Sequence, residues 1–379
     1  MKKKIDILVV GAGASALMFA SLLKNKEILL LDNNSKVGSK LLISGGGKCN
    51  ITNGVVKPLN YLGNQRFIRN IIKRFDQFDL LNWLAERGLK PIIRTREQYF
   101  CKESAREIVY IFKRESKSST YHLNTKVLSV IKSNNSFEIT TTEGIFYAKK
   151  LIVASGGLSF PKLGASSIGY DIAKSFGHEI TTLSAGLVGF TVQPEQFFFK
   201  SLSGIAIDVN ITIGNKEVQG ALLFAHKGIS GPSILDASLY WNRGKITIDF
   251  IPTVNLKSLK SSKKYLSKIL ALPLRVSKTF LEELHIEDKP ANRLTSDEWR
   301  MVEQLKEYSF APAGTFGYSK AEVTKGGVST DEIDASSMMS KKVENLYFLG
   351  EVLDVTGELG GYNFQWAFST AYVCAKGMN

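Results

Sequence analysis

The stretch IDILVVGAGASALMFASLLKNKEILLLD, residues 5–32, decides the fold of this chain. An apolar run of strand length, Ile5–Val10, leads into the turn Gly11–Ala16, and leucines at helical spacing follow. A second apolar run, Ile28–Leu31, ends at Asp32. Strand, glycine turn, helix, second strand and an acid about twenty residues after the glycines form the dinucleotide-binding fingerprint. The stretch therefore predicts a nucleotide-binding βαβ unit.

The residue types in the turn suit a bound pyrophosphate. Gly11 permits the tight turn, Gly13 lets backbone approach the pyrophosphate, and Ala16 stands where the pattern tolerates alanine in place of a third glycine. The helix that follows offers free N–H groups and the positive end of its dipole to the phosphates. Asp32 is placed to accept hydrogen bonds from a ribose. An ordinary βαβ unit that binds nothing is the alternative, and the combination of strand, helix and acid favours the ligand.

Length and charge limit the classes of protein to be considered. A chain of 379 residues exceeds the usual single core and predicts roughly two or three domains. The formal net charge of +14 indicates an anionic partner, nucleic acid or a membrane surface, with a lysine-rich proteome background as an equal alternative. The cysteines Cys49, Cys101 and Cys374 lack metal-site spacing and are too few for a disulfide framework. A reducing compartment fits that cysteine usage.

The start of the chain imitates a signal peptide, because Lys2–Lys4 precede an apolar run. Asp6 interrupts that run, and the fingerprint glycines need the segment retained. No later stretch is long and apolar enough to span a bilayer. We therefore expect a cytoplasmic protein with no membrane span.

A second glycine-rich stretch, GSKLLISGGGKCNITN at residues 38–53, predicts a ligand-binding loop. Three consecutive glycines are costly inside a helix or strand. Lys40 and Lys48 can neutralise phosphate, while Ser44 and Asn50 offer adaptable hydrogen bonds. A flexible surface loop is the alternative. It does not explain why short polar residues alternate here with apolar ones.

Glycines also follow several later strands. Ser155 and Gly156 follow the apolar run at residues 151–154, at the carboxyl end where open α/β sheets bind ligands. Gly350 follows another buried run, and Glu351 beside it is placed to bind a polyol. The segment 360–363 opens an apolar helix whose dipole would stabilise negative charge on a reduced ring. Residues 123–130 predict a strand, and Val127 within it lies where a chain commonly passes a cofactor's adenine.

The middle of the chain changes character. Residues 205–213 alternate apolar and polar side chains, which predicts an antiparallel β-barrel inserted in the α/β domain. His226 lies in a glycine-rich loop there, and the choice between substrate contact and an exposed structural histidine stays open. Residues 255–270 predict an amphipathic helix. Its lysine stripe comprises Lys257, Lys260, Lys264 and Lys268, and suits either a phosphate backbone or plain solvation. Residues 67–87 predict another helix, with Arg66, Arg69, Lys73 and Arg74 on or near it.

Long motifs along nearly the whole chain resemble the YhiN/BaiN-like flavoprotein family. These motifs are GAGASA, GSKLLISGGGKCNITN, ASGG, FAHKGISGP, AEVTKGGV and LGEVLDVTGELGGYNFQWA. The resemblance implies a noncovalently bound FAD, a nicotinamide electron donor, NAD(P)H, and reduction of carbon–carbon double bonds. Such reactions include conversion of ribosomal RNA uridine to dihydrouridine and steps in bile-acid metabolism. The sequence departs from the family where Asp32 replaces a common glutamate, and where Lys40 and Lys48 replace arginines and lose the bidentate fork.

These observations predict a Rossmann-like α/β FAD-binding fold of the two-dinucleotide-binding-domain type, with an inserted β-barrel and an inserted helical domain. We expect residues 1–188 and 310–379 to form the FAD-binding domain, 189–251 the barrel and 252–309 the helical domain. The residues expected to bind the cofactor are Gly11, Gly13, Ala14, Ser15, Ala16, Asp32, Asn33, Lys40, Ser44, Gly46, Asn50, Val127, Ser155, Gly156, Gly350, Glu351, Gly360, Gly361, Tyr362 and Asn363.

Three functions compete at this stage. The first is reduction of uridine in ribosomal RNA, supported by the resemblance, the net charge and the lysine stripe. The second is reduction of a small enone, steroid or amine, and the third is a flavin-binding sensor or assembly factor without turnover. Reducing the uracil C5–C6 bond needs a hydride and a proton donor. Cys49 is the first candidate for that acid and His226 the second, with a small buried hydrophobe as the alternative for Cys49. The nicotinamide, the acceptor and the oligomeric state stay open.

Overall fold

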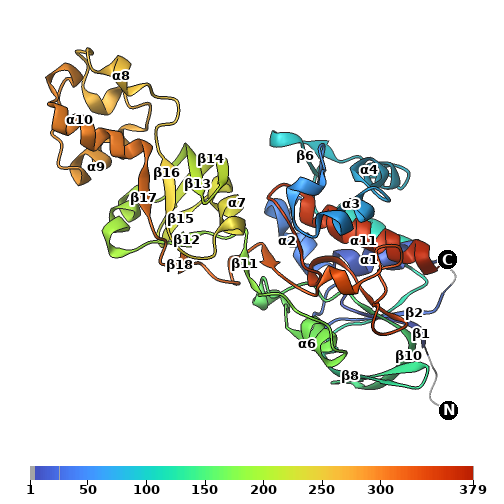
Figure 1. Ribbon diagram of the computed structural model, residues 1–379. Helices are drawn as coiled ribbons and strands as arrows, with labels where there is room; N and C mark the ends of the chain where they lie inside the picture. Colours follow the sequence, from blue (N-terminus) through green and yellow to red (C-terminus); the bar gives the residue numbers. More distant parts are fainter. Residues whose placement is uncertain (1–4, 25, 379) are drawn as a thin grey trace. The chain divides into compact units, whose positions relative to one another are not determined.

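The computed structural model describes residues 5–24 and 26–378, so Lys2–Lys4 lie outside the described part. Two compact units make up the chain (Figure 1): unit 1 is Met1–Ala185 with Glu322–Asn379, and unit 2 is Gly186–Ala321. Each unit has its own hydrophobic core. The predicted division into three domains, with boundaries after 188, 251 and 309, stays a prediction.

Unit 1 is built on a seven-stranded sheet that contains the predicted βαβ unit. Strand β1 (Ile5–Val10), helix α1 (Ala14–Leu22) and strand β2 (Ile28–Leu31) follow one another, and the two strands pair in parallel. The order is β7-β2-β1-β10-β9-β8, with β20 also paired to β10. The remaining strands are β7 (Thr120–His122), β8 (Val127–Ser133), β9 (Ser136–Thr141), β10 (Gly144–Val153) and β20 (Leu346–Phe348).

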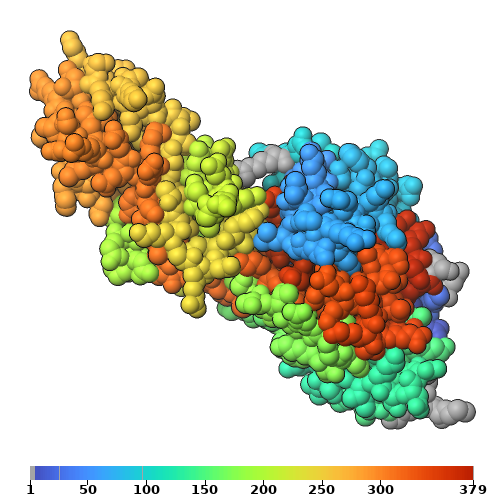
Figure 2. Space-filling view, viewed as in Figure 1, coloured from blue at the N-terminus to red at the C-terminus, as the bar shows by residue number. Residues whose placement is uncertain are grey.

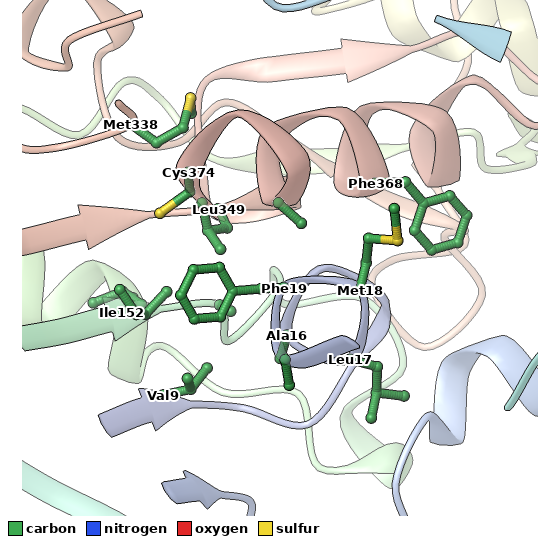
Figure 3. Close-up of a cluster of buried hydrophobic side chains, with 14 of the residues drawn as sticks. Val9, Ala16, Leu17, Met18, Phe19, Ile152, Met338, Leu349, Phe368 and Cys374 are labelled. Carbon is green, nitrogen blue, oxygen red and sulfur yellow. The ribbon is translucent and has the colours of Figure 1, made fainter. Parts of the chain in front are cut away.

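The central strands pair in parallel, and β8, β9 and β10 form an antiparallel meander. Helices α1, α5 (Arg106–Glu115) and α11 (Tyr362–Met378) pack together. Figure 3 shows Phe19 of α1 between the strands that carry Val9 and Ile152 and the helix that carries Cys374. All four side chains are buried. This packing explains why β1 and β10 end in continuous apolar runs rather than alternating ones.

The segment between β2 and β7 carries smaller elements. Strands β3 (Asn50–Asn53), β5 (Ile92–Ile93) and β6 (Gln98–Phe100) form one sheet, and β4 (Tyr61–Gly63) pairs with β21 (Val355–Gly357). The helix predicted over 67–87 is wrong, because two helices occur: α3 (Gln65–Ile72) and α4 (Gln77–Ala85). The Asp76 side chain accepts hydrogen bonds from the N–H groups of Phe78 and Asp79. That cap starts a new helix where the apolar period alone suggested continuity.

Unit 1 also contains two further helices and two further short strands. They are α2 (Ser39–Gly47), α6 (Ile168–Ser175), β11 (Ser184–Gly186) and β19 (Val323–Lys325). Helix α2 is irregular, since Ser44 has an extended ψ and Gly45 and Gly46 have left-handed φ values of 55° and 66°. The backbone at Gly45 and Gly46 is therefore not helical although it lies within the bounds of α2, in keeping with the loop that the sequence predicted there.

Unit 2 contains a seven-stranded antiparallel sheet in the order β17-β16-β13-β14-β15-β12-β18. Its strands are β12 (Phe190–Thr191), β13 (Ala206–Ile213), β14 (Lys216–Ala225), β15 (Gly228–Ser230), β16 (Ile246–Asp249), β17 (Tyr308–Phe310) and β18 (Gly314–Thr315). The predicted alternation holds along β13, where every second residue is buried. Helix α7 (Pro232–Tyr240) packs against β13 and β14.

A helical part of unit 2 carries α8 (Leu256–Leu259), α9 (Leu274–Glu283) and α10 (Ser296–Glu303), and it shares one core with the sheet. The amphipathic helix predicted over 255–270 is wrong, because α8 ends at Leu259. The Ser262 side chain accepts from the N–H of Lys264, and the Ser262 carbonyl accepts from the N–H of Asn292. Serine bonding of this kind competes with helical hydrogen bonding.

Some features are absent from the described residues, 5–24 and 26–378. No helix there has both the length and the apolar character needed to cross a bilayer. No cluster of three or more His, Cys, Asp or Glu side chains is arranged to hold a metal ion within those residues. The three cysteines are free and buried.

Candidate functional site

The two fingerprint glycines have different structural roles. The N–H of Gly11 donates to the carbonyl of Leu31 over 2.7 Å, and its φ of 107° is in the region that favours glycine. A Cβ at Gly11 would lie 2.5 Å from the Ala154 carbonyl oxygen. A Cβ at Gly13 would meet no protein atom within 4 Å. Gly11 is thus required by the protein's own packing, whereas the space at Gly13 is available to a ligand.

The N-terminus of α1 faces the same turn. Gly13 is the N-cap residue, and no side chain caps the helix. The first intrahelical bond there runs from the Leu17 N–H to the Gly13 carbonyl. The N–H groups of Ala14, Ser15 and Ala16 therefore precede the regular helical bonding and suit an anion.

Asp32 lies directly against the turn. Its Oδ2 accepts from the Ala12 N–H over 2.7 Å, and its Oδ1 accepts from the N–H and the side-chain amide of Asn34. A carboxylate has about four acceptor positions, so one is left for a hydroxyl group. Asn33 is turned to another segment, because its amide donates to the Gly164 carbonyl over 2.8 Å. The hydrogen bonds fix Asp32 beside the open space at Gly13.

Lys40, Thr324 and Glu351 join three distant segments of unit 1. Lys40 Nζ lies 2.7 Å from Glu351 Oε2, and the Thr324 N–H donates to Glu351 Oε1 over 2.9 Å. The Thr324 hydroxyl oxygen accepts from the Leu158 N–H over 2.7 Å. The sequence analysis assigned Lys40 and Glu351 separately and missed Thr324. The sequence feature that could have indicated Thr324 is its position in the motif AEVTKGGV, two residues before a glycine pair.

The loop after β10 contacts the same segments. Gly156 has a φ of 72°, and a Cβ on Gly157 would lie 2.5 Å from the Thr324 hydroxyl oxygen. Ser155 packs its hydroxyl against Gly169, since a Cβ there would lie 2.1 Å from that oxygen. Gly157 therefore approaches Thr324 too closely for a side chain, whereas a Cβ on Gly156 would meet only Glu351 Oε2, at 4.0 Å. The close contact explains Gly157 without a ligand, and the positive φ explains Gly156.

The distorted end of α2 is close to a buried polar pair. A Cβ at Gly46 would meet no protein atom within 4 Å, whereas one at Gly45 would lie 2.8 Å from the Phe100 ring. Asn50 donates its amide to Gln98 Oε1 over 3.0 Å. Asn50 Oδ1 is buried and has no hydrogen-bond partner within the described part of the chain. An orphaned acceptor near open glycine backbone is costly unless a ligand satisfies it.

Two further predicted residues of this segment have partners of their own. The Ser44 hydroxyl donates to the Leu41 carbonyl over 2.8 Å. Lys48 Nζ lies 3.4 Å from the Lys102 carbonyl oxygen. Ser44 therefore supports the bend in α2, and its hydroxyl oxygen retains acceptor capacity.

The N-terminus of α11 is held tightly against β3. Gly360 and Gly361 have φ values of 136° and 96°, and a Cβ on Gly361 would lie 2.6 Å from the Thr52 carbonyl. The Asn363 side chain exchanges two hydrogen bonds with Gly357, of 2.9 and 2.8 Å. Tyr362 is nearly buried, and its carbonyl accepts from the Tyr61 hydroxyl over 3.1 Å. Asn363 therefore shapes the turn before the helix and has its amide engaged there.

A cavity and the start of β8 lie close to Asp32 in unit 1. Val127 is buried at the start of β8. A cavity of about 570 Å³ is lined by Tyr121, His122, Leu123, Asn124, Thr125, Glu143 and Phe146. The Thr125 N–H donates to the Asp32 carbonyl over 2.8 Å, so this cavity borders the acidic end of the fingerprint.

The structure does not support Cys49 as a proton donor. Its side chain has no exposed surface, and burial raises the pKa of its thiol far above the usual value, with the neighbouring Cys101 adding to the rise. His226 is exposed in the short turn between β14 and β15. It belongs to unit 2, whereas the fingerprint belongs to unit 1.

The site fits a dinucleotide on three observations from unit 1: open space at Gly13, open space at Gly46, and the orphaned Asn50 Oδ1. A helix N-terminus suits the pyrophosphate and Asp32 suits a ribose. Fold and site together define a Rossmann-like dinucleotide-binding protein.

Comparisons with known proteins narrow this class. The family described as "HI0933-like protein Rossmann domain" matches residues 5–377. The chain is 39% identical over 392 residues to a ribosomal RNA dihydrouridine synthase of Escherichia coli, covering 99% of this chain and 98% of the relative. It is 27% identical over 402 residues to a 3-dehydro-bile acid delta(4,6)-reductase of Clostridium scindens, covering 97% of each. The chain belongs to the HI0933-like family, the YhiN/BaiN group of FAD-dependent oxidoreductases.

Solved structures support the fold. An Escherichia coli quinol fumarate reductase with a mutation in FrdA matches with a TM-score of 0.51 at 12% identity, covering 99% of this chain and 70% of that chain. A quinol-fumarate reductase with menaquinol molecules matches with a TM-score of 0.53 at 13% identity, covering 99% and 71%. The predicted fold class, a Rossmann-like FAD-binding α/β protein with inserted elements, is confirmed.

Proposed function

We propose that this enzyme uses NAD(P)H and FAD to reduce the C5–C6 double bond of uridine in ribosomal RNA. The observation that carries the proposal is 39% identity to the E. coli ribosomal RNA dihydrouridine synthase across 99% of this chain. The alignment covers nearly the full length of both proteins, so it includes both units of this chain. The formal net charge of +14 suits a polyanionic substrate.

The residues of unit 1 would hold the cofactor in an extended arrangement. Gly13 and the first turn of α1 would bind the pyrophosphate, and Asp32 the adenosine ribose, with Val127 next to the adenine. Glu351, oriented by Lys40 and Thr324, would bind the ribityl chain. The α11 N-terminus and Asn50 Oδ1 would lie near the ring system. When bound, FAD would supply the hydride that this reduction requires.

The reduction also needs a proton at the second carbon. Cys49 is not retained for this role, because its thiol is buried and the raised pKa makes it a weak proton donor. We retain His226 as the side chain that donates this proton, because its imidazole is exposed and imidazole commonly transfers protons. A His226→Gln variant should reduce the flavin with NAD(P)H at the parent rate and form dihydrouridine at least about tenfold more slowly, an ordinary magnitude for general acid catalysis. Equal rates would exclude His226 and leave Tyr362 or water.

The decisive experiment compares ribosomal RNA from cells with and without the gene by mass spectrometry of nucleosides. A dihydrouridine present with the gene and absent without it is expected. Reintroducing the parent gene should restore it, and a Gly13→Ala gene should not. Unchanged dihydrouridine in the deletion strain would contradict the proposal.

A small-molecule double bond is the second candidate acceptor, favoured by the full-length relation to the bile acid reductase. The purified enzyme should distinguish the two. Dihydrouridine formed on a ribosomal RNA transcript supports the first proposal. Rapid turnover of a steroid enone with no reaction on RNA would support the second. The family assignment gives no support to a flavin-binding sensor without turnover.

A further inference from the structure

A lysine-rich segment lies on the surface of unit 2. Residues 256–268, here called the lysine segment, contain five lysines and no acidic residue. The lysines are Lys257, Lys260, Lys263, Lys264 and Lys268, and all five side chains are exposed. In Figure 2 the segment is part of the yellow-orange surface of unit 2. Although the segment is not one helix, its charges are still concentrated in one part of the fold.

The backbone of the lysine segment is firmly anchored. Leu256 and Leu266 are buried in the core of unit 2. Residues 289–292 run beside it, with hydrogen bonds from the Leu266 N–H to the Lys289 carbonyl and from the Ala291 N–H to the Lys264 carbonyl, of 3.1 and 3.0 Å. Arg293 is exposed and directly follows this paired stretch in the chain. The positive groups are therefore held on a fixed framework.

Most of these charges have no acidic partner. Lys260 lies 3.8 Å from Glu303, and Lys289 lies 2.7 Å from Glu298. Asp288 accepts from the N–H and hydroxyl of Ser267. Within residues 26–378, the other four lysines of the segment and Arg293 form no salt bridge. Uncompensated cations held together repel one another, and a polyanion relieves that repulsion.

An aromatic side chain lies among the cations. The Tyr265 side chain is 49% exposed, although the next residue, Leu266, is buried in the core of unit 2. A tyrosine ring between lysines offers a stacking surface for a base beside contacts for phosphates. A lipid surface would need an exposed apolar face. The leucines that alternate with these lysines are turned into the core instead.

We propose that the lysine segment and Arg293 bind the phosphodiester backbone of the RNA substrate, while Tyr265 stacks on an unpaired base. This inference rests on the proposed function and assigns substrate recognition to unit 2. The lysines contribute affinity without reading sequence, because phosphate contacts carry no base information. They also help to offset the free-energy cost of unstacking a target base.

The test uses the full chain and ribosomal RNA transcripts. Lys263, Lys264 and Lys268 are replaced together by Gln, and the matched control replaces Lys90, Lys113 and Lys117 by Gln. The control lysines are exposed residues of unit 1. Both variants lose the same charge. Anisotropy titrations across a salt series then give the affinity and its salt dependence.

At about 0.15 M salt, the segment variant should bind RNA at least about tenfold more weakly, with the slope of log K against log salt reduced by about 2 to 3. The control should stay within about twofold of the parent. Equal losses in both variants would show a nonspecific charge effect and overturn the proposal. Weaker binding to phosphatidylglycerol vesicles with unchanged RNA affinity would assign the surface to lipid and overturn it as well.

Tyr265 is tested separately. Tyr265→Ala should weaken binding to single-stranded RNA about tenfold and leave duplex binding unchanged, whereas Tyr265→Phe should match the parent. Equal affinity of the parent and both variants for single-stranded RNA would show that Tyr265 takes no part in RNA binding.

Catalytic readouts separate this inference from the proposed function. The segment variant should lose kcat/KM for dihydrouridine formation, with kcat at saturating RNA and the rate of flavin reduction unchanged. If the parent enzyme formed no dihydrouridine, the proposed function would fail. The binding comparison would then still decide whether this surface holds RNA.

Discussion

At the scale of single residues, the fingerprint glycines separate the needs of the fold from those of the ligand. The backbone at Gly11 is left-handed and touches the Ala154 carbonyl, so its missing side chain serves the packing of β1 against β10. Gly13 has an ordinary φ of −86° and open space in front of it. Glycine is therefore needed at position 11 for backbone packing, whereas at position 13 it leaves space for a ligand.

Two alanine substitutions test this distinction. Gly11→Ala should lower the free energy of unfolding by at least about 2 kcal/mol, because strain and a steric clash combine. Gly13→Ala should change it by less than about 0.5 kcal/mol. It should nevertheless weaken FAD binding at least about tenfold, because its methyl group would occupy the proposed pyrophosphate position. Denaturant unfolding of the apoprotein and FAD titrations measure both effects. Normal FAD affinity in Gly13→Ala would place the pyrophosphate elsewhere.

Cys49 belongs to the core. Cys49→Ala should lose about 1–2 kcal/mol of stability, as expected for a small buried cavity, and should retain dihydrouridine formation. In the folded parent, Cys49 and Cys101 should resist thiol reagents at pH 8, because burial raises both pKa values, that of Cys101 to about 11. Cys101→Ala is the matched control. A flavin-loaded Cys49→Ala enzyme that failed only in uridine reduction would restore Cys49 as the proton donor.

At the scale of elements, a buried histidine ties the end of α6 to two loops. His178 Nδ1 lies 2.9 Å from Glu332, and Nε2 lies 2.8 Å from the Ser340 hydroxyl. That hydroxyl oxygen accepts from the N–H groups of Lys342 and Val343, so its own proton is free to be donated to Nε2. The geometry therefore favours neutral histidine with the proton on Nδ1.

This network should give the stability of the protein a pH dependence. Burial lowers the pKa of His178 below its usual 6.5, although Glu332 opposes that effect. As pH falls through 6.5 towards the lower native pKa, the unfolded state takes up the proton first, and folding stability decreases. The loss of unfolding free energy between pH 7 and 5.5 should therefore be larger in the parent than in His178→Gln. Parallel curves would contradict this assignment.

Glu332 changes stability in the same direction as His178, but in a lower pH range. Burial raises its pKa, but hydrogen bonds from Lys342, the Glu179 N–H and His178 outweigh burial and hold the pKa below 4.5. Its contribution is present above pH 4.5 and is lost as pH falls further. The two residues therefore act in separate pH ranges, which keeps the His178 comparison at pH 5.5–7 interpretable.

At the scale of the whole molecule, the chain leaves unit 1 at Ala185 and returns at Glu322. Unit 2 is one continuous segment with its own sheet and core. Unit 1 is discontinuous, because β20 and α11 come from its second segment and complete the sheet and the helix layer.

Fragments should reflect this organisation. A fragment of residues 186–321 should unfold cooperatively on heating, because its apolar side chains already have partners inside the segment. A fragment of residues 1–185 should not, since it would expose the faces that β20 and α11 cover. Circular dichroism melts of both fragments measure this. A cooperative melt of the 1–185 fragment alone would contradict the split arrangement.

Local sequence determined the parts of the protein in which neighbouring residues carry the constraint. The fingerprint from Ile5 to Asp32 specified strand, turn, helix and acid in the right order, because each step depends on short-range backbone preferences and apolar periodicity. The alternation along β13 was equally visible. Local periodicity failed at Asp76 and Ser262, where a side chain bonding to nearby backbone ends or starts a helix.

Only the tertiary structure decided which distant groups meet. Lys40 and Glu351 are 311 residues apart and form one ion pair, and Thr324 joins them through a backbone N–H. Cys49 lies in a polar, glycine-rich stretch, yet it is buried, since burial depends on what the rest of the chain places over a residue. Likewise, residues 262–266, predicted as part of one helix, are held instead by backbone hydrogen bonds to residues 289–292. Spacing along a chain fixes local conformation, whereas contacts over hundreds of residues depend on the path of the whole fold.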